Sequence, residues 1–582
     1  MRAGATLRLP RDDTCKHNRT FAPDMQIPTS QDTQPFLHQQ CIGNEIVSLR
    51  NRVLMDTIPA DWKYCMELRK RCKKTGYAMP PTRELTFDEA FAAMPTKKRL
   101  SYLNLVDRYH QEGVLPRDSR ITAFIKYERL VDGSKDPRMI QFRGKKYGLA
   151  LGRYLKQIEH HLYRLKVVEG FPVGRLVAKG LNNIKRASLL RKKLAQFRDP
   201  VVYSLDAKRF DAHVGRLLLQ AEHALYTAAI HNPELNRLLQ MQLVNKGTTG
   251  NGIKYRCPGG RMSGDMNTAL GNCILMVHMV AQAFSHIKFK DVLDDGDDIL
   301  LIVERADEHL IPLGIENMRK FGMEVSIDNV TDVLEKVTFC QSRPVFDGVG
   351  YKFIRNPHKS LGFGVNARKT LGSGTKAYAH YLVANGLCEM ALSTGVPCLQ
   401  AYGKRLVDIG RSLGGKGKLN QLSAKQQTRL RQTLGVKTDA ELERIARWRE
   451  VTPRARQSFA LAWDISPDEQ VHIEAMCGQL LPGERLSPPQ PDQRWAIIPN
   501  SAHITPLTAT WCYPSVRSAT NLSKLRSILP NIRQRSTLWC NRLRSLLPSS
   551  LDLATEIALH ALIRRTRWTS RLVASLPAMP LP

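Results

Sequence analysis

Two adjacent carboxylates occupy a place where they could bind a divalent cation. Asp297 and Asp298 follow Gly296 and come directly before the apolar run 299–303. An Asp-Gly turn between two strand-like segments predicts a hairpin, and it places both aspartates at the turn. The tripeptide Gly-Asp-Asp is weak evidence by itself, because a chain of this length contains it by chance about one time in ten at ordinary amino-acid frequencies. Taken alone, it is better explained as a solvated turn.

A further carboxylate ends an earlier apolar run. Residues 201–205 predict a buried strand that delivers Asp206, and Asp211 follows five residues later. If this strand pairs beside the hairpin, Asp206 and Asp297 can face each other across a pair of metal ions. Nucleotidyl transfer needs such a pair, because one ion lowers the pKa of the attacking hydroxyl and the other neutralises the leaving pyrophosphate. Mg²⁺ prefers oxygen ligands. In isolation, Asp206 is better explained as a strand-end aspartate that caps a turn.

The segment between these acidic residues predicts a loop followed by a helix. Ser263 and Gly264 lie in a glycine-containing stretch that we expect to form a flexible loop. Thr268 and Asn272, four residues apart, share one face of the helix that follows. Beside a metal site, such a polar pair could sense a ribose hydroxyl. Another face carries an apolar stripe that fits plain core packing, made of Met266, Leu270, Cys273, Val277, Val280 and Phe284.

The composition constrains the partner and the compartment. The 582 residues include 87 Lys and Arg against 53 Asp and Glu, a net charge of +34. This excess predicts a polyanionic partner, either nucleic acid or an anionic membrane surface. The 12 cysteines show no spacing suited to zinc, which fits free thiols in a reducing compartment. No apolar stretch reaches the roughly 20 residues of a membrane span, and the N-terminus lacks the apolar region of a secretory signal. We therefore expect a cytosolic enzyme of mixed α/β structure.

In this order and at these separations, the three segments resemble the palm of viral RNA-dependent RNA polymerases. Asp206 and Asp211 match the Asp-x4-Asp of motif A, and residues 296–298 match the Gly-Asp-Asp of motif C. The stretch that begins with Ser263 and ends with Asn272 matches the Ser-Gly-x3-Thr-x3-Asn of motif B. The closer similarity is to plant-virus polymerases of the tombusvirus and carmovirus kind. Segments similar to their motif A and motif E region carry it, at 204–213, 337–341, 344–346 and 355–357.

A basic segment upstream of these motifs resembles motif F of the same family, which lines the tunnel through which nucleotides enter. Residue matching assigns Lys126 and Arg138 to contacts with the triphosphate. Lys and Arg at such an entry attract the triphosphate and offset charge that develops in the transition state. Four more cations are ambiguous, because a solvated basic face or a template-phosphate contact explains them at least as well. They are Arg143, Lys145, Lys146 and Arg153.

The resemblance implies the fold class and the domain organisation. The expected class is α/β (α+β), as a right-hand polymerase fold with fingers, palm and thumb around a central antiparallel sheet. The expected domains run as an N-terminal extension with fingertip elements, fingers that include motif F, a palm with motifs A to E, a thumb and a basic C-terminal tail. Their bounds are 1–96, 97–200, 201–349 with an inserted finger portion at about 214–258, 350–481 and 482–582.

The resemblance also implies a function and a role for each site residue. The function is RNA-directed RNA synthesis that replicates a positive-strand viral genome, by two-metal-ion transfer from NTPs to an RNA 3′-hydroxyl. The cofactor is Mg²⁺, with Mn²⁺ as a substitute. Asp206 and Asp297 would bind both ions with help from Asp298, and Asp211 and Asn272 would read the ribose 2′-hydroxyl. The remaining nucleotide-binding residues are Ser263 and Gly264, which would flex as the site closes, and Thr268.

Two departures from the family pattern bear on this assignment. Asp295 stands where relatives often carry a neutral polar residue, so the turn gathers four carboxylates. Their mutual repulsion should raise the pKa of at least one of them unless metal is bound. The motif D lysine, the general acid for pyrophosphate, is not clearly placed. Glu324 occupies the expected basic position, which leaves Lys320 and Lys336 as alternatives.

The C-terminal tail and the partners complete the sequence-based expectations. Leu and Ile recur at three- and four-residue spacing among Arg residues after position 521, which predicts a basic amphipathic helix on RNA or on a membrane surface. A poorly ordered tail, interrupted by Pro530 and Pro548, is an equal alternative. The resemblance implies template RNA, product RNA and NTPs as partners. By analogy it also implies a membrane-anchored viral replication protein and a location in the host cytoplasm at membrane-associated replication sites.

Two rival classes are weighed against the polymerase. A non-catalytic basic RNA-binding protein fits the charge of +34, but it leaves the clustered acidic residues unexplained. A reverse transcriptase has a similar palm, but Asp295 stands where an aromatic residue is expected. Template-dependent incorporation separates the first rival, and use of dNTPs separates the second.

Overall fold

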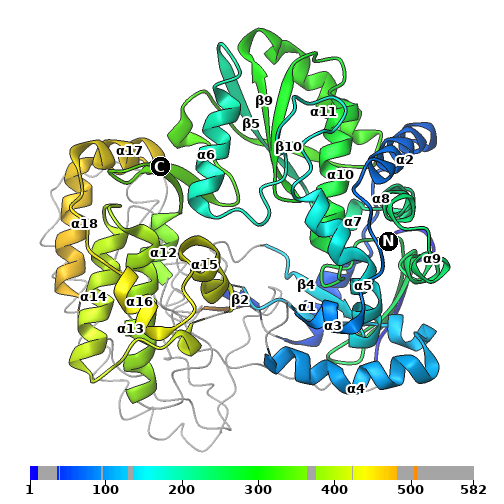
Figure 1. Ribbon diagram of the computed structural model, residues 1–582, viewed down its shortest axis with the longest axis horizontal. Coiled ribbons are helices and arrows are strands. Elements are labelled where there is room, and N and C mark those ends of the chain that lie inside the picture. The colour runs from blue at the N-terminus through cyan, green and yellow to red at the C-terminus, as the bar shows by residue number, and fades with distance from the viewer. Residues whose placement is uncertain are drawn as a thin grey trace, which may run out of the picture. The chain divides into compact units, whose positions relative to one another are not determined.

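The structure is a computed structural model that describes most of the chain up to residue 480 (Figure 1). The described residues are 1–10, 36–38, 40–92, 96–128, 135–363, 375–422, 424–480 and 504–506. Helices and mainly antiparallel sheets alternate along them, so the predicted mixed α/β class is confirmed. Apart from 504–506, the predicted tail at 482–582 lies outside the described residues. The described cysteines are all free.

A four-stranded antiparallel sheet carries the acidic motifs. Its strand order is β10-β5-β9-β8, and β8 and β9 form a hairpin. The strands expected at 201–205 and 299–303 are both present, each slightly longer than the apolar run that predicts it. The bounds are β5 (Pro200–Ala207), β8 (Lys290–Asp294), β9 (Asp298–Glu304) and β10 (Val325–Thr331).

Helices cover both faces of this sheet. In Figure 1, α10 (Thr268–Ala283) and α11 (Ile311–Arg319) lie on one side and α6 (Asn183–Leu194) lies on the other. Successive side chains of a strand point to opposite faces. Leu301 accordingly packs in the core that contains α10, whereas Leu300 packs in the core that contains α6. Covering both faces explains why β9 is apolar at nearly every position rather than at alternate ones.

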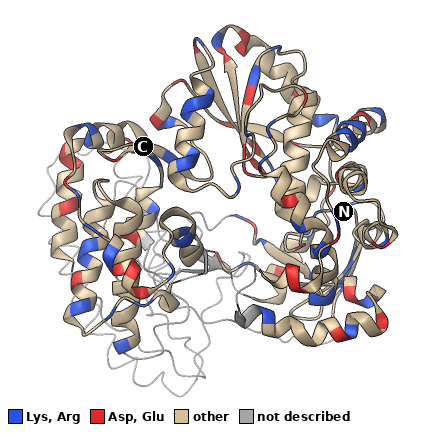
Figure 2. Cartoon of the chain, in the orientation of Figure 1, with Lys and Arg blue, Asp and Glu red and all other residues tan. Residues whose placement is uncertain are grey.

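Helix α6 also brings positive charge to its side of the sheet. Figure 2 shows several Lys and Arg along this helix. They are Lys185, Arg186, Arg191, Lys192 and Lys193. The apolar side chains Ala187 and Leu190 bury the helix against the sheet, and Lys193 is buried with them in an ion pair with Asp291 of β8 at 2.7 Å. The other cations lie on the remaining faces of this amphipathic helix.

A second sheet joins segments that are more than a hundred residues apart in the sequence. Its strand order is β1-β7-β6-β3-β4, in which β3 and β6 run parallel and the other pairs antiparallel. The strands that follow β5 therefore complete a sheet whose other strands lie before it. The bounds are β1 (Thr6–Arg8), β3 (Ile121–Ile125), β4 (Met139–Arg143), β6 (Val244–Thr249) and β7 (Lys254–Pro258).

Helices of the first half of the chain pack around these two sheets. The largest core joins α5, α8 and α10 with the inner face of the four-stranded sheet. The bounds of the remaining elements are α1 (Ile42–Ser48), η1 (Leu49–Val53), α2 (Trp62–Tyr77), α3 (Phe87–Ala92), α4 (Thr96–Glu112), η2 (Pro116–Ser119), α5 (Lys145–Leu162), α7 (Phe210–His213), α8 (Arg216–Ala229), α9 (Pro233–Gln240), η3 (Arg305–Leu310) and η4 (Leu334–Lys336). A two-stranded pairing joins β2 (Phe36–His38) to β13 (Ile504–Pro506).

The region after residue 342 is a hairpin followed by helices. The strands β11 (Ser342–Phe346) and β12 (Tyr351–Arg355) pair with each other, and their apolar residues share a core with the helices. The helices are α12 (Pro357–Phe363), α13 (Thr375–Ser393), α14 (Leu399–Ser412), η6 (Leu419–Gln421), α15 (Ala424–Leu434), α16 (Asp439–Ile445), α17 (Pro453–Trp463) and α18 (Pro467–Gln479). Within the described part of the chain, every helix is too short or too polar to cross a membrane. The predicted domain boundaries stay predictions.

Candidate active site

The register of β5 and β9 brings two of the predicted acidic residues together. Asp206 lies directly opposite Asp298, with both side chains on the α6 side of the sheet. Directly paired residues of antiparallel strands have Cβ atoms about 5 Å apart. The sequence predicts that Asp206 and Asp297 face each other across a pair of metal ions, and this stays a prediction, although the charge of Asp297 does act on Asp206. Asp298 is the first residue of β9, whereas Asp297 lies in the exposed turn before it.

These carboxylates repel one another. Partial removal from water, together with the charges of Asp297, Asp295 and Asp206, raises the pKa of Asp298 to about 6. Burial and the charges of Asp328 and Asp297 raise the pKa of Asp206 above its ordinary value. The expectation that at least one carboxylate at the turn has a raised pKa is confirmed. The sequence did not point to Asp328, which comes close only because β10 pairs with β5.

The donor set fits a hard divalent cation in its chemistry. Three carboxylates with only oxygen donors lie at one end of the sheet, and a cation would remove the repulsion that raises their pKa values. In the described part of the chain, no group of three His, Cys, Asp or Glu side chains is arranged to hold a metal ion. The assignment of Asp206, Asp297 and Asp298 as metal ligands therefore stays a prediction.

Asp295 adds to the repulsion at Asp298 and is itself held by two cations. Its carboxylate forms ion pairs with both Lys179 and Arg186, and the Lys179 ammonium also donates to its backbone carbonyl at 2.8 Å. Asp294 points to the opposite face, where burial raises its pKa well above the ordinary value. The four carboxylates are not arranged alike, because Asp295 is paired with two cations and Asp294 is buried on the other side of the sheet, but the charge of Asp295 still acts on both Asp298 and Asp294.

The predicted ribose-sensing residues, Asp211 and Asn272, also come together. Arg209 adopts a left-handed backbone conformation after β5, with φ of 50°, and this turns the chain into the short helix α7 that carries Asp211. The Asn272 amide nitrogen on α10 lies 3.5 Å from the Asp211 Oδ1. Burial and the nearby Asp297 raise the pKa of Asp211 to about 6. The pair therefore lies within reach of the charge of the acidic turn.

Ser263 and Gly264 are anchored rather than free. The Ser263 hydroxyl donates to the Met139 carbonyl at 3.2 Å and accepts from the Gln141 amide at 3.2 Å. The Gly264 amide donates to the Gln141 carbonyl at 2.7 Å, and a side chain at Gly264 would collide with that carbonyl. The loop that the sequence predicts to be flexible is thus docked on β4 in this structure. Movement of this pair during closure stays a prediction.

Thr268 lies at the start of α10, and its hydroxyl donates to the Met262 carbonyl at 2.7 Å. This contact closes the loop onto the helix, and a joint role of Thr268 and Asn272 at a ribose hydroxyl stays a prediction. The helix begins at Thr268, which leaves Met266 in the preceding turn instead of in the apolar stripe. From Leu270 onward α10 is buried on every side, because the sheet and neighbouring helices surround it.

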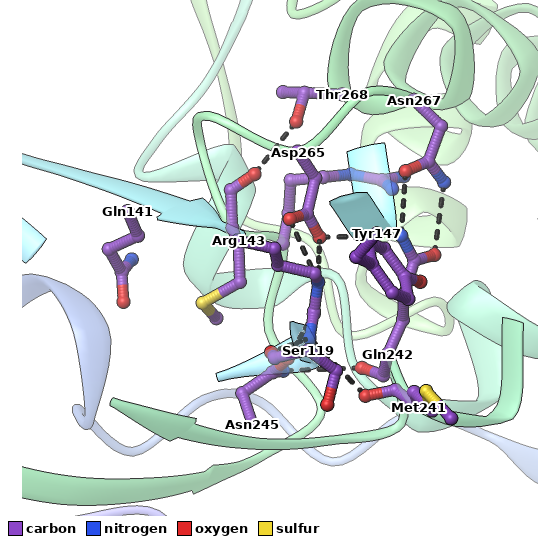
Figure 3. A network of polar contacts seen from close by, with 12 residues as sticks. Ser119, Gln141, Arg143, Tyr147, Met241, Gln242, Asn245, Asp265, Asn267 and Thr268 are labelled. Carbon is purple, nitrogen blue, oxygen red and sulfur yellow. Dashed lines mark hydrogen bonds and ion pairs between the residues drawn. The ribbon is translucent and has the colours of Figure 1, made fainter. Parts of the chain in front are cut away.

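Figure 3 shows a buried polar network that supports the same loop. Arg143 on β4 forms an ion pair with Asp265 at 2.9 Å, and both side chains are at most 4% exposed. Its guanidinium also donates to the Ser119 carbonyl at 2.8 Å and to the Asn245 side chain. Gln242 links Asp265 to Asn267. Arg143 therefore holds the loop against β4, and its burial contradicts the solvated basic face that the sequence offered for it.

The other ambiguous cations also have internal partners. Lys146 is buried between Glu112 at 2.6 Å and Asp118 at 3.0 Å. Arg153 pairs with Glu84 at 2.7 Å. These partners give both residues a role within the fold, whereas among the described residues Lys145 contacts only a tyrosine ring, by a cation–π interaction.

Lys126 and Arg138 lie side by side at the ends of β3 and β4. The Lys126 amide donates to the Arg138 carbonyl at 2.7 Å, and both side chains pair with Glu128, at 2.9 Å and 3.5 Å. The pKa values of Asp206 and Asp211 are raised overall, and the charge of Arg138 offsets part of the rise in each. Two predicted triphosphate contacts are thus brought near the acidic residues.

The motif D position remains open between its two alternatives. Glu324 pairs with Lys208 at 2.9 Å. Lys320 donates to Asn317 at 2.7 Å and lies 5.4 Å from the ring centre of Tyr64, so it has a packing role. The structure shows no contact of Lys320 or Lys336 with the acidic residues in the part it describes.

Sequence reasoning missed several charged residues that position the site. Lys179 and Arg186 neutralise Asp295, and Arg261 and Glu222 form a buried ion pair beside Asn272. A signal existed for Glu222, because a lone carboxylate in an otherwise apolar stretch of α8 requires a buried partner. The other three gave no local signal, since nothing in their neighbouring residues identifies a partner.

Comparisons with known proteins agree with the motifs. The model of the family described as viral RNA dependent RNA polymerase matches residues 27–481. The RNA-directed RNA polymerase of Tobacco necrosis virus (strain A) is 34% identical over 409 residues, which are 66% of this chain and 53% of that protein. The corresponding enzyme of Oat chlorotic stunt virus is 30% identical over 500 residues, 81% of this chain and 65% of that protein.

A third relative is the RNA-directed RNA polymerase of Turnip crinkle virus, which is 33% identical over 384 residues, or 64% of this chain and 48% of that protein. The chain spans about half to two thirds of the length of these curated relatives. Because the family model covers well over half of the chain, this chain belongs to the viral RNA-dependent RNA polymerase family.

Proposed function

We propose that this protein is an RNA-directed RNA polymerase that replicates a positive-strand viral RNA genome. The reaction transfers a nucleotide from an NTP to the 3′-hydroxyl of the growing RNA strand. The observation that carries the proposal is the direct pairing of Asp206 with Asp298, next to Asp297, in a chain that matches the polymerase family. The proposed architecture is a right hand, with the four-stranded sheet as the centre of the palm.

Each site residue has a proposed role that follows from its position. Asp206, Asp297 and Asp298 would hold two Mg²⁺ ions, with Mn²⁺ as a substitute. When bound, these ions activate the attacking hydroxyl and neutralise the leaving pyrophosphate. Lys126 and Arg138 attract the triphosphate into the site, since both are cationic and Arg138 acts electrostatically on the acidic residues.

Selection of the sugar is assigned to Asp211 and Asn272. The Asp211 carboxylate can accept a hydrogen bond from the ribose 2′-hydroxyl, and the Asn272 amide can donate one to the same oxygen. A deoxyribose would leave both buried polar groups without this partner, which is how a hydrogen-bonding site rejects an analogue that lacks a hydroxyl. Their contact at 3.5 Å supports a shared substrate group.

The proposed partners are template RNA, product RNA and NTPs. The net charge of +34 supports a polyanionic partner whose binding weakens steeply as salt increases. A membrane-anchored viral replication protein is a further proposed partner, with a location in the host cytoplasm at membrane-associated replication sites. Contact of the basic tail with a membrane is proposed from its sequence alone.

The function is tested with purified protein, a short RNA template, Mg²⁺ and labelled NTPs. We expect template-dependent product from the wild type and none from Asp297→Asn. The matched control is Asp468→Asn, which changes an exposed aspartate in the first turn of α18 and should leave synthesis intact. Equal product from wild type and Asp297→Asn would remove the metal role from Asp297.

The same assay separates the two rival classes. Template-dependent incorporation by the wild type contradicts a non-catalytic RNA-binding protein. A preference for NTPs over dNTPs contradicts a reverse transcriptase. Failure of the wild type to extend any template, with folded protein and both metal ions tested, would refute the proposed polymerase.

A further inference from the structure

A buried ion pair lies beside the proposed sugar-sensing residues and has no role in the chemistry described so far. Arg261, two residues before Ser263, pairs with Glu222 of α8, and the two side chains are 1% and 0% exposed. The Glu222 carboxylate also accepts hydrogen bonds from the Tyr226 hydroxyl at 2.6 Å and from the Asn267 amide at 2.7 Å. A buried charge pair is stable only when its hydrogen-bonding capacity is satisfied, and this one meets that condition.

The same arginine also contacts Asn272. The Arg261 Nε donates to the Asn272 Oδ1 at 3.1 Å, while its terminal nitrogens are engaged by Glu222. An asparagine amide has one accepting oxygen and one donating nitrogen. Because the oxygen is taken by Arg261, the nitrogen is directed toward Asp211, 3.5 Å away. The guanidinium therefore fixes which way round the amide lies.

The helix is adapted to this arrangement. Gly271, directly before Asn272, lies inside α10, where glycine is less favourable than alanine. A Cβ at this position would collide with the Glu222 carboxylate and with Arg261. The absence of a side chain at Gly271 is what lets the ion pair approach α10 closely enough to reach Asn272.

We propose that Arg261, held by Glu222, is a positioning residue that sets the selectivity for ribonucleotides by fixing the orientation of the Asn272 amide. This inference rests on the proposed polymerase function and on the sugar-sensing role of Asp211 and Asn272. With the amide reversed, its oxygen would face the Asp211 carboxylate, and neither group would donate to the 2′-hydroxyl. The loss would fall on NTPs, since dNTPs make no such bond.

The decisive variant is Arg261→Lys. A lysine keeps the positive charge beside Glu222, but its single nitrogen cannot reproduce the fork that bonds Glu222 and Asn272 together. We expect the ratio of kcat/KM for NTPs to kcat/KM for dNTPs to fall about tenfold, mainly through the NTP term, as a hydrogen bond to the hydroxyl is lost. A merely structural role would lower both terms together and leave the ratio unchanged.

The matched control is Arg143→Lys. Arg143 forms an equally buried ion pair that supports the same loop from its other side, through Asp265. We expect this variant to lose thermal stability and overall rate, with the NTP to dNTP ratio as in wild type. Should Arg261→Lys fail to fold, Glu222→Gln is measured in its place, because it removes the anchor of Arg261 while keeping the shape of the side chain. Its ratio should fall in the same direction.

A double-variant comparison gives an independent readout. Once Asn272→Ala has removed the amide, adding Arg261→Lys should change the ratio no further, because the two residues act through one contact. Additive effects would overturn the inference. The inference would also be overturned if Asn272→Ala lowered the ratio but Arg261→Lys, or Glu222→Gln in its place, kept the wild-type ratio. That result would leave the proposed function standing.

Two outcomes would refute the proposals on which this inference rests. An unchanged ratio in Asn272→Ala would refute the sugar-sensing role and, with it, the positioning role of Arg261. A wild-type protein that makes no templated product would refute the polymerase function on which the inference rests. Synthesis by the wild type thus tests the polymerase function and Asn272→Ala tests the sugar-sensing role, so failure of the positioning role of Arg261 can be distinguished from failure of either.

Discussion

The turn before β9 and the interior beside α8 differ in whether their charged side chains form ion pairs. At the turn, Asp206, Asp297 and Asp298 lie close together, and none of them forms an ion pair with a Lys or Arg that the structure describes. In the interior, Arg261 and Glu222 are buried but paired, and so are Arg143 and Asp265. The carboxylates of the first region are therefore free to bind a ligand, whereas the charges of the second are neutralised by partners within the fold.

The difference shows which charged groups serve a ligand and which serve the structure. A buried pair with satisfied hydrogen bonds stabilises one geometry and leaves no charge for a substrate. Carboxylates held close together without a cation are unfavourable, and their raised pKa values record that repulsion. We interpret the acidic turn as the place where a cation binds and the interior pairs as the frame that holds the turn and loop in place.

The largest expected effect tests the acidic turn. Asp206→Asn should lower the rate of templated extension on the order of 10³-fold, as expected for loss of a preorganised electrostatic group. Its stability without metal should not fall, because removing one negative charge relieves repulsion. Single-nucleotide extension measures the rate, and urea denaturation in EDTA measures stability. If Asp206→Asn were active and less stable than the wild type, Asp206 would serve the structure and not a ligand.

The next effect tests the interior. Glu222→Ala leaves Arg261 buried without its anionic partner, which should lower the free energy of unfolding by about 3–5 kcal/mol. Urea denaturation measures this loss. The double variant Glu222→Leu with Arg261→Met removes both charges, and we expect it to recover much of the stability. A loss below about 1 kcal/mol in Glu222→Ala would show that the pair is not essential to the frame.

A smaller effect concerns the two cations that share Glu128. Arg138→Ala should raise the KM for NTPs about tenfold with a smaller change in kcat, because one charge that attracts the triphosphate is lost. Glu128→Gln should lower the KM, since it releases Lys126 and Arg138 from their common partner. Steady-state kinetics measure both, with Lys70→Ala on the exposed face of α2 as the control. Equal KM values in all three variants would contradict the triphosphate assignment.

The smallest effect is a pH dependence at the turn. The pKa of Asp298 is about 6 in the folded protein, above its ordinary value of 3.8, so the folded state binds more protons between these values. Without metal, the free energy of unfolding of the wild type should therefore fall as pH rises from about 4 to about 6. Asp298→Asn should not show the part of this fall that comes from ionisation of Asp298. Asp298 still reaches solvent, which screens the repulsion, so we expect a difference of about 1 kcal/mol above pH 7.

Thermal unfolding in EDTA at pH 4 and pH 8 measures this difference. The two proteins should unfold alike at pH 4, and Asp298→Asn should be the more stable at pH 8. Adding Mg²⁺ at pH 8 should favour the wild type, because a cation removes the repulsion. If wild type and Asp298→Asn differed in stability by the same amount at both pH values, the charge of Asp298 would not be the cause of the difference.

Much of the site could be predicted from the sequence because its motifs are local. The run 201–205 is apolar enough to predict β5, and the Asp-Gly step predicts the turn before β9. The pairing of Asp211 with Asn272 followed from the family motifs. The register itself could not be predicted, because the direct pairing of Asp206 with Asp298 depends on where β9 begins and not on the order of residues in the turn.

The sequence by itself determined the strands, the acidic turn, the motif order and the excess of positive charge, since these depend on neighbouring residues and on composition. Only the tertiary structure decided the partners of the charges. Asp295 meets Lys179, 116 positions away, and Arg261 meets Glu222 across the packing of α8 against α10. A side chain finds a distant partner only after helices and strands have packed, and local periodicity carries no information about which charge will be brought beside it.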